Sequence, residues 1–171
     1  MLPALQGDDG LLPVGVHKAS IADIRKRFGS KSVSTGGRRR DIIIDALDVY
    51  ARMVRSEFLK PTIWVNGGLV TAKKWAEPDD ADIAVFVDPA QFGADVEEKL
   101  KLLRTGTADH LTIQKKTLDN VQIKPMGGLI DGYIMADSPP SRRYWHNLFS
   151  SVRLADRSIS NTLTKGFVEL T

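Results

Sequence analysis

The chain has 171 residues, of which 42% are hydrophobic and 26% charged, as is usual for one folded domain with its own core. It contains no cysteine, which excludes disulfides, zinc–thiolate sites and cysteine nucleophiles. The formal net charge of +3 does not by itself indicate nucleic-acid binding. No apolar run approaches the length of a membrane span and the N-terminus has no signal-peptide pattern, so we expect a cytoplasmic protein without a membrane partner.

The first half of the chain predicts two helices after an irregular start. Glycines and prolines recur in residues 1–15, which indicates an irregular leader. Ser20 and Asp23 form a helix-capping pair, so a helix is expected over 21–28, ending at Gly29. Residues 29–37 read as a polar loop. Apolar residues at steps of three and four predict a long helix over 41–59.

The second half predicts mostly strands. Short apolar runs indicate strands at 63–65 and 83–87, with a helical turn over 69–74 and a loop over 75–79 between them. Further along, the expected helices are 95–104 and 141–149, and the expected strands are 110–116, 121–124, 129–135 and an edge strand over 166–170. This order predicts a single domain over 1–171 of the α/β (α+β) class, a mixed β-sheet flanked by helices.

Two aspartates, Asp80 and Asp82, stand at the start of the strand expected over 83–87. Side chains two residues apart lie on one face of a strand, with α-carbons about 6.5 Å apart. Two such carboxylates repel each other unless a cation lies between them, and Mg²⁺ (or Mn²⁺) prefers oxygen ligands of this kind. The spacing therefore predicts a metal-dependent site for phosphates, while the alternative is a solvated acidic loop.

Asp131 is the candidate for a third carboxylate. It lies inside the apolar strand 129–135, where an aspartate is unfavourable unless it is paired. If this strand lies beside 83–87, Asp131 faces the other two aspartates and completes a site that can hold two cations, with Asp131 as ligand or as proton acceptor. Asp137 is a rival third ligand at the end of the same strand, and an exposed Asp131 on a one-sided sheet is the alternative.

The run from Trp64 to Ile83 resembles the signature of the DNA polymerase beta-like nucleotidyltransferase superfamily. The apolar pair Trp64–Val65 and then Asn66 precede Gly67–Gly68, eleven residues follow, and Asp80–Ala81–Asp82 then opens a strand, with a further aspartate on a later strand. The resemblance is clear over 61–90 and extends to 135; the ends of the chain look like a small prokaryotic branch. It implies a mixed-sheet catalytic core, Mg²⁺ and a nucleoside triphosphate donor.

Four residues are candidates for binding the triphosphate. Gly67 and Gly68 form a bare turn that a phosphate chain can approach closely, and Lys73 and Lys165 could each bind a phosphate as a point charge. Many members of the superfamily have a serine at the second turn position, and Gly68 lacks that hydroxyl. The alternatives are a tight structural turn for the glycines and ordinary surface positions for the lysines.

Two basic clusters suggest a further partner. Arg38–Arg40 precede the long helix, where positive charge opposes the helix dipole, so they are candidates for an anion or nucleic-acid contact or for a solvated loop end. Arg142–Arg143 stand beside Tyr144–His146, which combines phosphate-binding with base-stacking side chains, although such aromatics also pack in cores.

The leading hypothesis is an enzyme that transfers a nucleotidyl group from a nucleoside triphosphate to a hydroxyl of RNA, protein or a small molecule. Asp80, Asp82 and Asp131 hold the metal in this hypothesis. A second hypothesis is a non-catalytic binding or regulatory module on the same fold, such as a toxin–antitoxin or phage-defence component. A third is a nucleic-acid-binding protein that uses the basic clusters. A homodimer or a partner protein could supply acceptor recognition.

Overall fold

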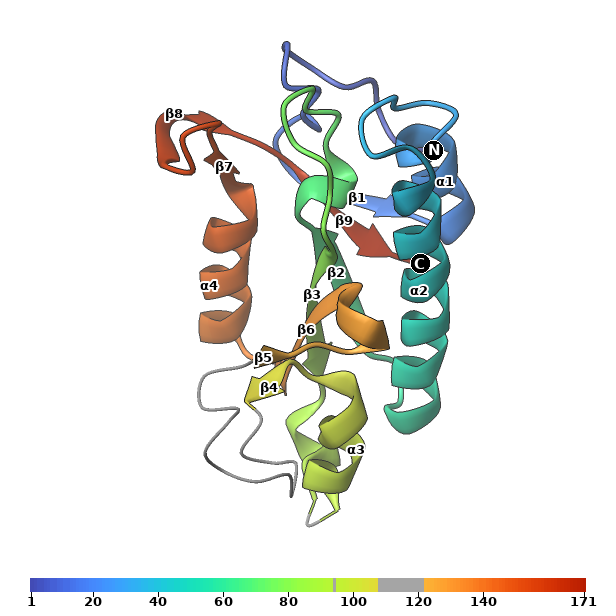
Figure 1. Ribbon diagram of the computed structural model, residues 1–171. Helices are drawn as coiled ribbons and strands as arrows, with labels where there is room; N and C mark the ends of the chain where they lie inside the picture. Colours follow the sequence, from blue (N-terminus) through green and yellow to red (C-terminus); the bar gives the residue numbers. More distant parts are fainter. Residues whose placement is uncertain (94, 108–121) are drawn as a thin grey trace.

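The computed structural model describes residues 1–93, 95–107 and 122–171. A five-stranded sheet of mixed direction is central to this part of the chain (Figure 1). Its strands, in spatial order, are β1 (Val16–Ala19), β9 (Phe167–Leu170), β2 (Thr62–Asn66), β3 (Ala81–Val87) and β6 (Ile130–Ala136). The β1–β9 and β3–β6 pairs are parallel, and β2 is antiparallel to both of its neighbours. The predicted α+β class with a mixed sheet is confirmed.

Helices cover both faces of this sheet (Figure 1). Helices α1 (Ile21–Phe28), α2 (Gly37–Glu57) and α3 (Val96–Leu103) pack on one face through a large apolar core, to which β3 contributes Ile83, Val85 and Val87. Of the helices in the described ranges, only α4 (Pro139–Ser150) lies on the other face, where Phe149 meets a smaller core of Trp64, Phe86 and Phe167. Alternate residues of β3 therefore serve two different cores, as the period of two in a strand requires.

Shorter elements complete the described part. Strands β4 (Gly106–Thr107) and β5 (Gln122–Ile123) pair, and so do β7 (Ser151–Arg153) and β8 (Ile159–Thr164). Short 3₁₀ turns occur at η1 (Gly68–Val70), η2 (Pro89–Gln91) and η4 (Met126–Gly128). None of the helices in the described ranges is both long and apolar enough to cross a membrane.

The predicted helix over 21–28 is confirmed, and its Ser20–Asp23 pair forms a complete capping box. The long helix begins at Gly37, four residues earlier than predicted, and ends at Glu57. Gly36 caps it without a side-chain hydrogen bond, so nothing in the local sequence signals this start. The structural reason is a buried Arg40 that anchors the first turn to neighbouring loops, as described below.

The prediction of an edge strand at 166–170 was wrong. Strand β9 lies inside the sheet because β1, a strand that we did not predict in the segment after the leader, pairs with it in parallel. The polar residue of its alternating pattern, Glu169, accepts a hydrogen bond from Trp64 Nε1 at 3.1 Å. The β7–β8 hairpin was not predicted either, and the strand predicted at 110–116 lies outside the described residues.

Candidate active site

The two predicted acidic strands lie side by side. Strands β3 and β6 pair in parallel along their whole length, and Asp82 is the register partner of Asp131. Ile83 and Ile130 contribute to the core under α2, so the two aspartates point to the opposite face of the sheet, which carries α4. The expected adjacency of these strands is confirmed, and it brings two carboxylates from distant parts of the chain to one place.

Lys124 connects the third carboxylate, Asp80, to this pair. Sequence analysis did not single out this lysine as part of the site. Lys124 Nζ lies 2.5 Å from Asp80 Oδ2 and 3.1 Å from Asp131 Oδ2. Asp80 immediately precedes β3, and Lys124 immediately follows β5. The two carboxylates raise the pKa of the Lys124 ammonium above its ordinary value, even though partial burial acts in the opposite direction. The ammonium therefore stays charged and neutralises part of the acidic cluster.

Asp131 is held in place by a second residue that sequence analysis missed. The Thr105 hydroxyl donates to Asp131 Oδ1 at 2.7 Å and accepts from the backbone N–H of Gly132 at 3.0 Å. Thr105 also donates its backbone N–H to the Gly132 carbonyl at 2.7 Å. The side chain of Asp131 is thus fixed through one oxygen by Thr105 and through the other by Lys124.

Asp82 is partly buried and lies next to both of the other carboxylates. Burial, assisted by the charges of Asp80 and Asp131, raises its pKa to about 6. Its carboxylate approaches Gly67 so closely that a Cβ on Gly67 would collide with Asp82 Oδ2. Gly67 also has a φ of +83°, a conformation that favours glycine. The predicted glycine turn therefore lies directly against the predicted acidic site.

Two arginines of the first basic cluster hold the loops that carry the site. Arg40 is completely buried and donates to the backbone carbonyls of Leu69 at 3.0 Å and Thr71 at 2.9 Å, both next to the glycine turn. Arg39 donates to the carbonyls of Pro78 at 3.1 Å and Asp79 at 2.7 Å, just before Asp80. The interpretation of Arg40 as an anion or nucleic-acid contact was wrong, because its guanidinium has no access to solvent.

The two candidate phosphate-binding lysines are both buried instead of exposed. Lys165 donates to Asn66 Oδ1, on the residue that precedes Gly67, and burial lowers its pKa to about 7. Lys73 donates to the carbonyl of Arg153 and lies 4.7 Å from the centre of the Trp75 ring. The structure thus brings Lys165 to the edge of the glycine turn, whereas Lys73 is bound to the β7–β8 hairpin.

The second basic cluster and the rival aspartate bind each other. Asp137 accepts from Arg142 Nε at 2.6 Å and from Arg142 Nη2 at 2.7 Å, so neither is available to the acidic site. Trp145 packs against Tyr133 with ring centres 4.9 Å apart. Tyr133 lies on the same face of β6 as Asp131, and burial, with the charge of Asp131, raises its phenol pKa. Tyr144 extends this aromatic set to the surface, where it is 64% exposed.

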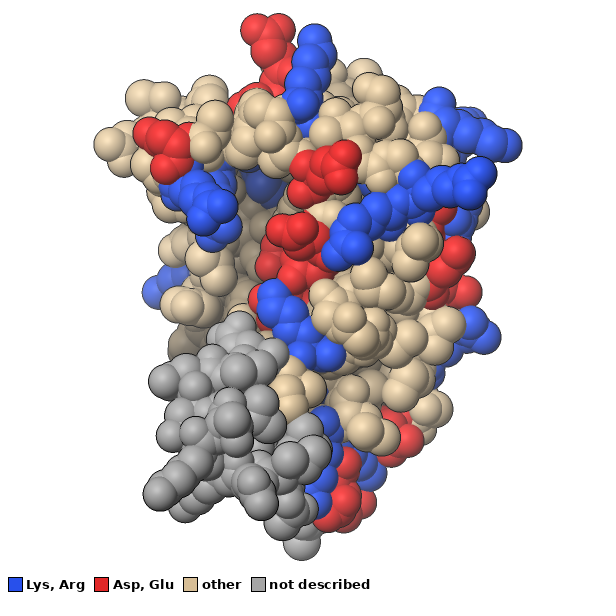
Figure 2. Space-filling model, viewed as in Figure 1, with Lys and Arg blue, Asp and Glu red and all other residues tan. Residues whose placement is uncertain are grey.

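The residues fit a hard divalent cation in their chemistry, although they are not arranged around one. Within the described ranges, no three His, Asp or Glu side chains already surround a common point. The position between Asp80 and Asp131 instead holds the Lys124 ammonium. An ammonium held by carboxylate oxygens marks a place where positive charge is favourable, and Mg²⁺ takes the same kind of ligand. Figure 2 shows acidic side chains gathered beside a hollow near the middle of the view, with basic side chains next to them.

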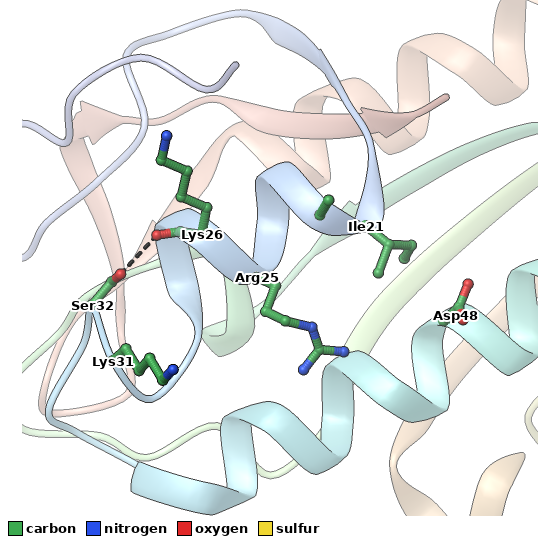
Figure 3. Close-up of a pocket in the computed structure, with 7 residues that line it drawn as sticks. Ile21, Arg25, Lys26, Lys31, Ser32 and Asp48 are labelled. Atoms are coloured by element: carbon green, nitrogen blue, oxygen red, sulfur yellow. Dashed lines mark hydrogen bonds between the residues drawn. The ribbon is translucent and has the colours of Figure 1, made fainter.

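A second hollow lies away from these carboxylates. It has a volume of about 710 Å³ and lies between α1, the loop after it and α2 (Figure 3). Its lining residues are Ile21, Ala22, Arg25, Lys26, Lys31, Ser32 and Asp48. Arg25 is paired with Asp45 at 2.6 Å, and the Ser32 hydroxyl donates to the Lys26 carbonyl at 2.7 Å. The hollow is open and contains none of the predicted site residues, so the acidic cluster is the better candidate.

Comparison with known proteins identifies a family without indicating an activity. Residues 3–171 match a family model described as "Family of unknown function (DUF6932)". No curated protein matches the chain, and no solved structure matches it.

Proposed function

The chain belongs to this family of unknown function, and we propose, from the geometry of its acidic site, that it is a metal-dependent nucleotidyltransferase. The observation that carries the proposal is the pairing of Asp82 with Asp131 across β3 and β6, with Asp80 joined to the same cluster through Lys124. Carboxylates from neighbouring strands beside a glycine turn are the arrangement expected for a site that binds a triphosphate and its cation.

Each part of the site has a separate role in this proposal. Asp80, Asp82 and Asp131 hold Mg²⁺ or Mn²⁺, which when bound neutralises the phosphates and polarises the incoming hydroxyl. Gly67 and Gly68 let the triphosphate approach the backbone, and Lys165 lies close enough to the turn to meet a phosphate. Arg39 and Arg40 hold the loop before Asp80 and the loop after the glycine turn through hydrogen bonds to their backbone carbonyls.

The reaction is an in-line displacement at the α-phosphorus of the nucleoside triphosphate. The oxygen of the acceptor hydroxyl forms a bond to this phosphorus, the bond to the bridging oxygen of the β-phosphate breaks, and pyrophosphate leaves. The hydroxyl proton passes to Asp131 or to solvent. Positioning and charge neutralisation supply most of the acceleration in such reactions, which suits a site made of fixed carboxylates and a rigid turn.

The resemblance to polymerase beta-like nucleotidyltransferases agrees with this proposal and adds the donor. We propose a nucleoside triphosphate as donor and a hydroxyl of RNA, protein or a small molecule as acceptor, in the cytoplasm. A second copy of the chain or a partner protein would supply the surface that recognises the acceptor.

The test is transfer of label from each α-³²P nucleoside triphosphate, with pyrophosphate release measured in parallel. We expect activity that requires Mg²⁺ or Mn²⁺ and that Asp82→Asn reduces by on the order of 100-fold or more. Asp8→Asn, which removes one exposed carboxylate elsewhere, is the matched control and should retain full activity. Equal activity of Asp82→Asn and the wild type would refute the assignment.

One observation favours a second function, a non-catalytic binding or regulatory module on the same fold. Lys124 already neutralises Asp80 and Asp131, so the cluster needs no metal to be stable. Calorimetric titration with Mg²⁺ and each of the four nucleoside triphosphates separates the two functions. Heat of binding that requires both components supports the enzyme, and no heat with any triphosphate supports the binding module.

A further inference from the structure

We propose that Lys124 is an internal counter-cation that competes with divalent metal for the acidic site, so that its departure from the carboxylates sets the metal affinity. This inference rests on the proposed function and extends it to the regulation of the same site. It assigns to Lys124 a role in controlling occupancy instead of a role in structure alone.

The Lys124 ammonium uses the oxygens that a metal would need. Lys124 donates to Asp80 Oδ2 at 2.5 Å and lies 3.1 Å from Asp131 Oδ2, and all three side chains are largely enclosed. A carboxylate oxygen in such an enclosed site cannot keep an ammonium at this distance while it binds a divalent cation, because the two positive charges repel each other strongly where water does not screen them. Binding of the metal therefore requires Lys124 to move away.

Other residues also hold the carboxylates, so their positions do not depend on Lys124 alone. Asp131 is fixed through its other oxygen by the Thr105 hydroxyl at 2.7 Å. The loop before Asp80 is held by Arg39, which donates to the Asp79 carbonyl at 2.7 Å. Lys124 comes from the segment after β5 and does not belong to β3 or β6. It can therefore leave while the ligands remain in place.

The test compares Mn²⁺ binding by the wild type, Lys124→Met and a matched control. Methionine keeps most of the side-chain volume and removes the charge. Lys99→Met is the matched control, because it also removes one positive charge. Lys99 lies in α3 and pairs at 3.1 Å with Asp95, which immediately precedes the helix. Mn²⁺ affinity is measured by electron paramagnetic resonance of the free ion. We expect Lys124→Met to bind Mn²⁺ at least tenfold more tightly than the wild type, and Lys99→Met to bind like the wild type.

The possible results separate this inference from the proposed function. Equal or weaker Mn²⁺ binding by Lys124→Met, with measurable binding by the wild type, overturns the competition and leaves the metal-dependent enzyme intact. An absence of Mn²⁺ binding in both proteins overturns the inference and the metal-dependent function together. Tighter binding by both lysine variants alike overturns the inference, since it indicates a general effect of net charge.

A second measurement uses the wild-type protein and does not depend on how the variant folds. Acylation of lysines by a water-soluble amine reagent, followed by peptide mass spectrometry, reports how accessible each ammonium is. We expect Mn²⁺ at saturating concentration to increase the acylation rate of Lys124 several-fold and to leave that of Lys99 unchanged. An unchanged rate at Lys124 with Mn²⁺ bound would show that the lysine stays on the carboxylates and would overturn the proposal.

Discussion

Asp82 and Asp131 are register partners on the parallel strands β3 and β6, and both side chains leave the sheet on the face that carries α4. Two largely enclosed carboxylates in this relationship repel each other, and Asp80 adds a third negative charge nearby. Lys124 relieves the repulsion at Asp80 and Asp131, whereas within the described part of the chain no ion pair reaches Asp82. The charged form of Asp82 therefore lowers the stability of the folded protein, which is typical of functional sites.

This cost predicts that replacing Asp82 stabilises the metal-free protein. Asp82→Asn keeps the shape of the side chain and removes the charge that burial and the neighbouring carboxylates disfavour. We expect the free energy of unfolding to rise by about 1–3 kcal/mol in urea at neutral pH with a chelator present. Asp8→Asn, in an exposed turn, should change it by less than about 0.5 kcal/mol. A destabilised Asp82→Asn would mean that the carboxylate makes a favourable contact that the charge argument omits.

The carboxylate strands could be predicted because their signal is local. Alternation in 129–135 places Ile130 and Ile134 on one face and therefore Asp131 on the other, and the structure packs both isoleucines against the main core. The capping box at Ser20 is likewise a signal within four residues. The close approach of Gly67 to Asp82 follows from the pairing of β2 with β3. These strands are close in the sequence, which favours their pairing.

The residues that hold the site could not be predicted, because their partners are distant in the sequence. Arg40 donates to a carbonyl 29 residues away, Thr105 to a carboxylate 26 residues away and Lys124 to one 44 residues away. Nothing in the local pattern distinguishes them from surface residues. The position of β9 inside the sheet was missed for the same reason, since it depends on pairing with β1 near the other end of the chain.

The glycine turn gives a prediction about steric fit. Gly67→Ala introduces a Cβ that collides with the Asp82 carboxylate, at a backbone φ of +83° that disfavours any side chain. We expect it to lower the free energy of unfolding by about 2–4 kcal/mol, measured by urea unfolding. Gly7→Ala is the matched control, since Gly7 has a φ of +67° but nothing within 4 Å of an added Cβ. It should cost only the backbone strain of about 1–2 kcal/mol, and equal losses would show that the contact with Asp82 is unimportant.

The buried arginine gives a prediction about the loops behind the site. Arg40→Met leaves the carbonyls of Leu69 and Thr71 without their donor in a buried environment. An unsatisfied buried polar group costs about 1–3 kcal/mol, so we expect a loss of about 3 kcal/mol or more in the free energy of unfolding. Arg38→Met removes an exposed arginine from the same cluster and should change little. If the two variants were equally stable, Arg40 could not be the anchor of the glycine turn.

The buried lysine gives a prediction about pH. Burial lowers the pKa of Lys165 from 10.5 to about 7 in the folded protein, so the unfolded chain binds more protons at this group between about pH 7 and pH 10. The contribution of Lys165 to stability therefore rises with pH across this window and is constant below it, where both states are protonated. Lys165→Met removes this group, so we expect the wild type to gain stability relative to the variant as the pH rises from 7 to 10. Lys74→Met, at an exposed position, should give a difference from the wild type that does not depend on pH. Urea unfolding at several pH values measures both differences in the free energy of unfolding. A difference for Lys165→Met that does not change with pH would mean that Lys165 keeps an ordinary pKa in the folded protein.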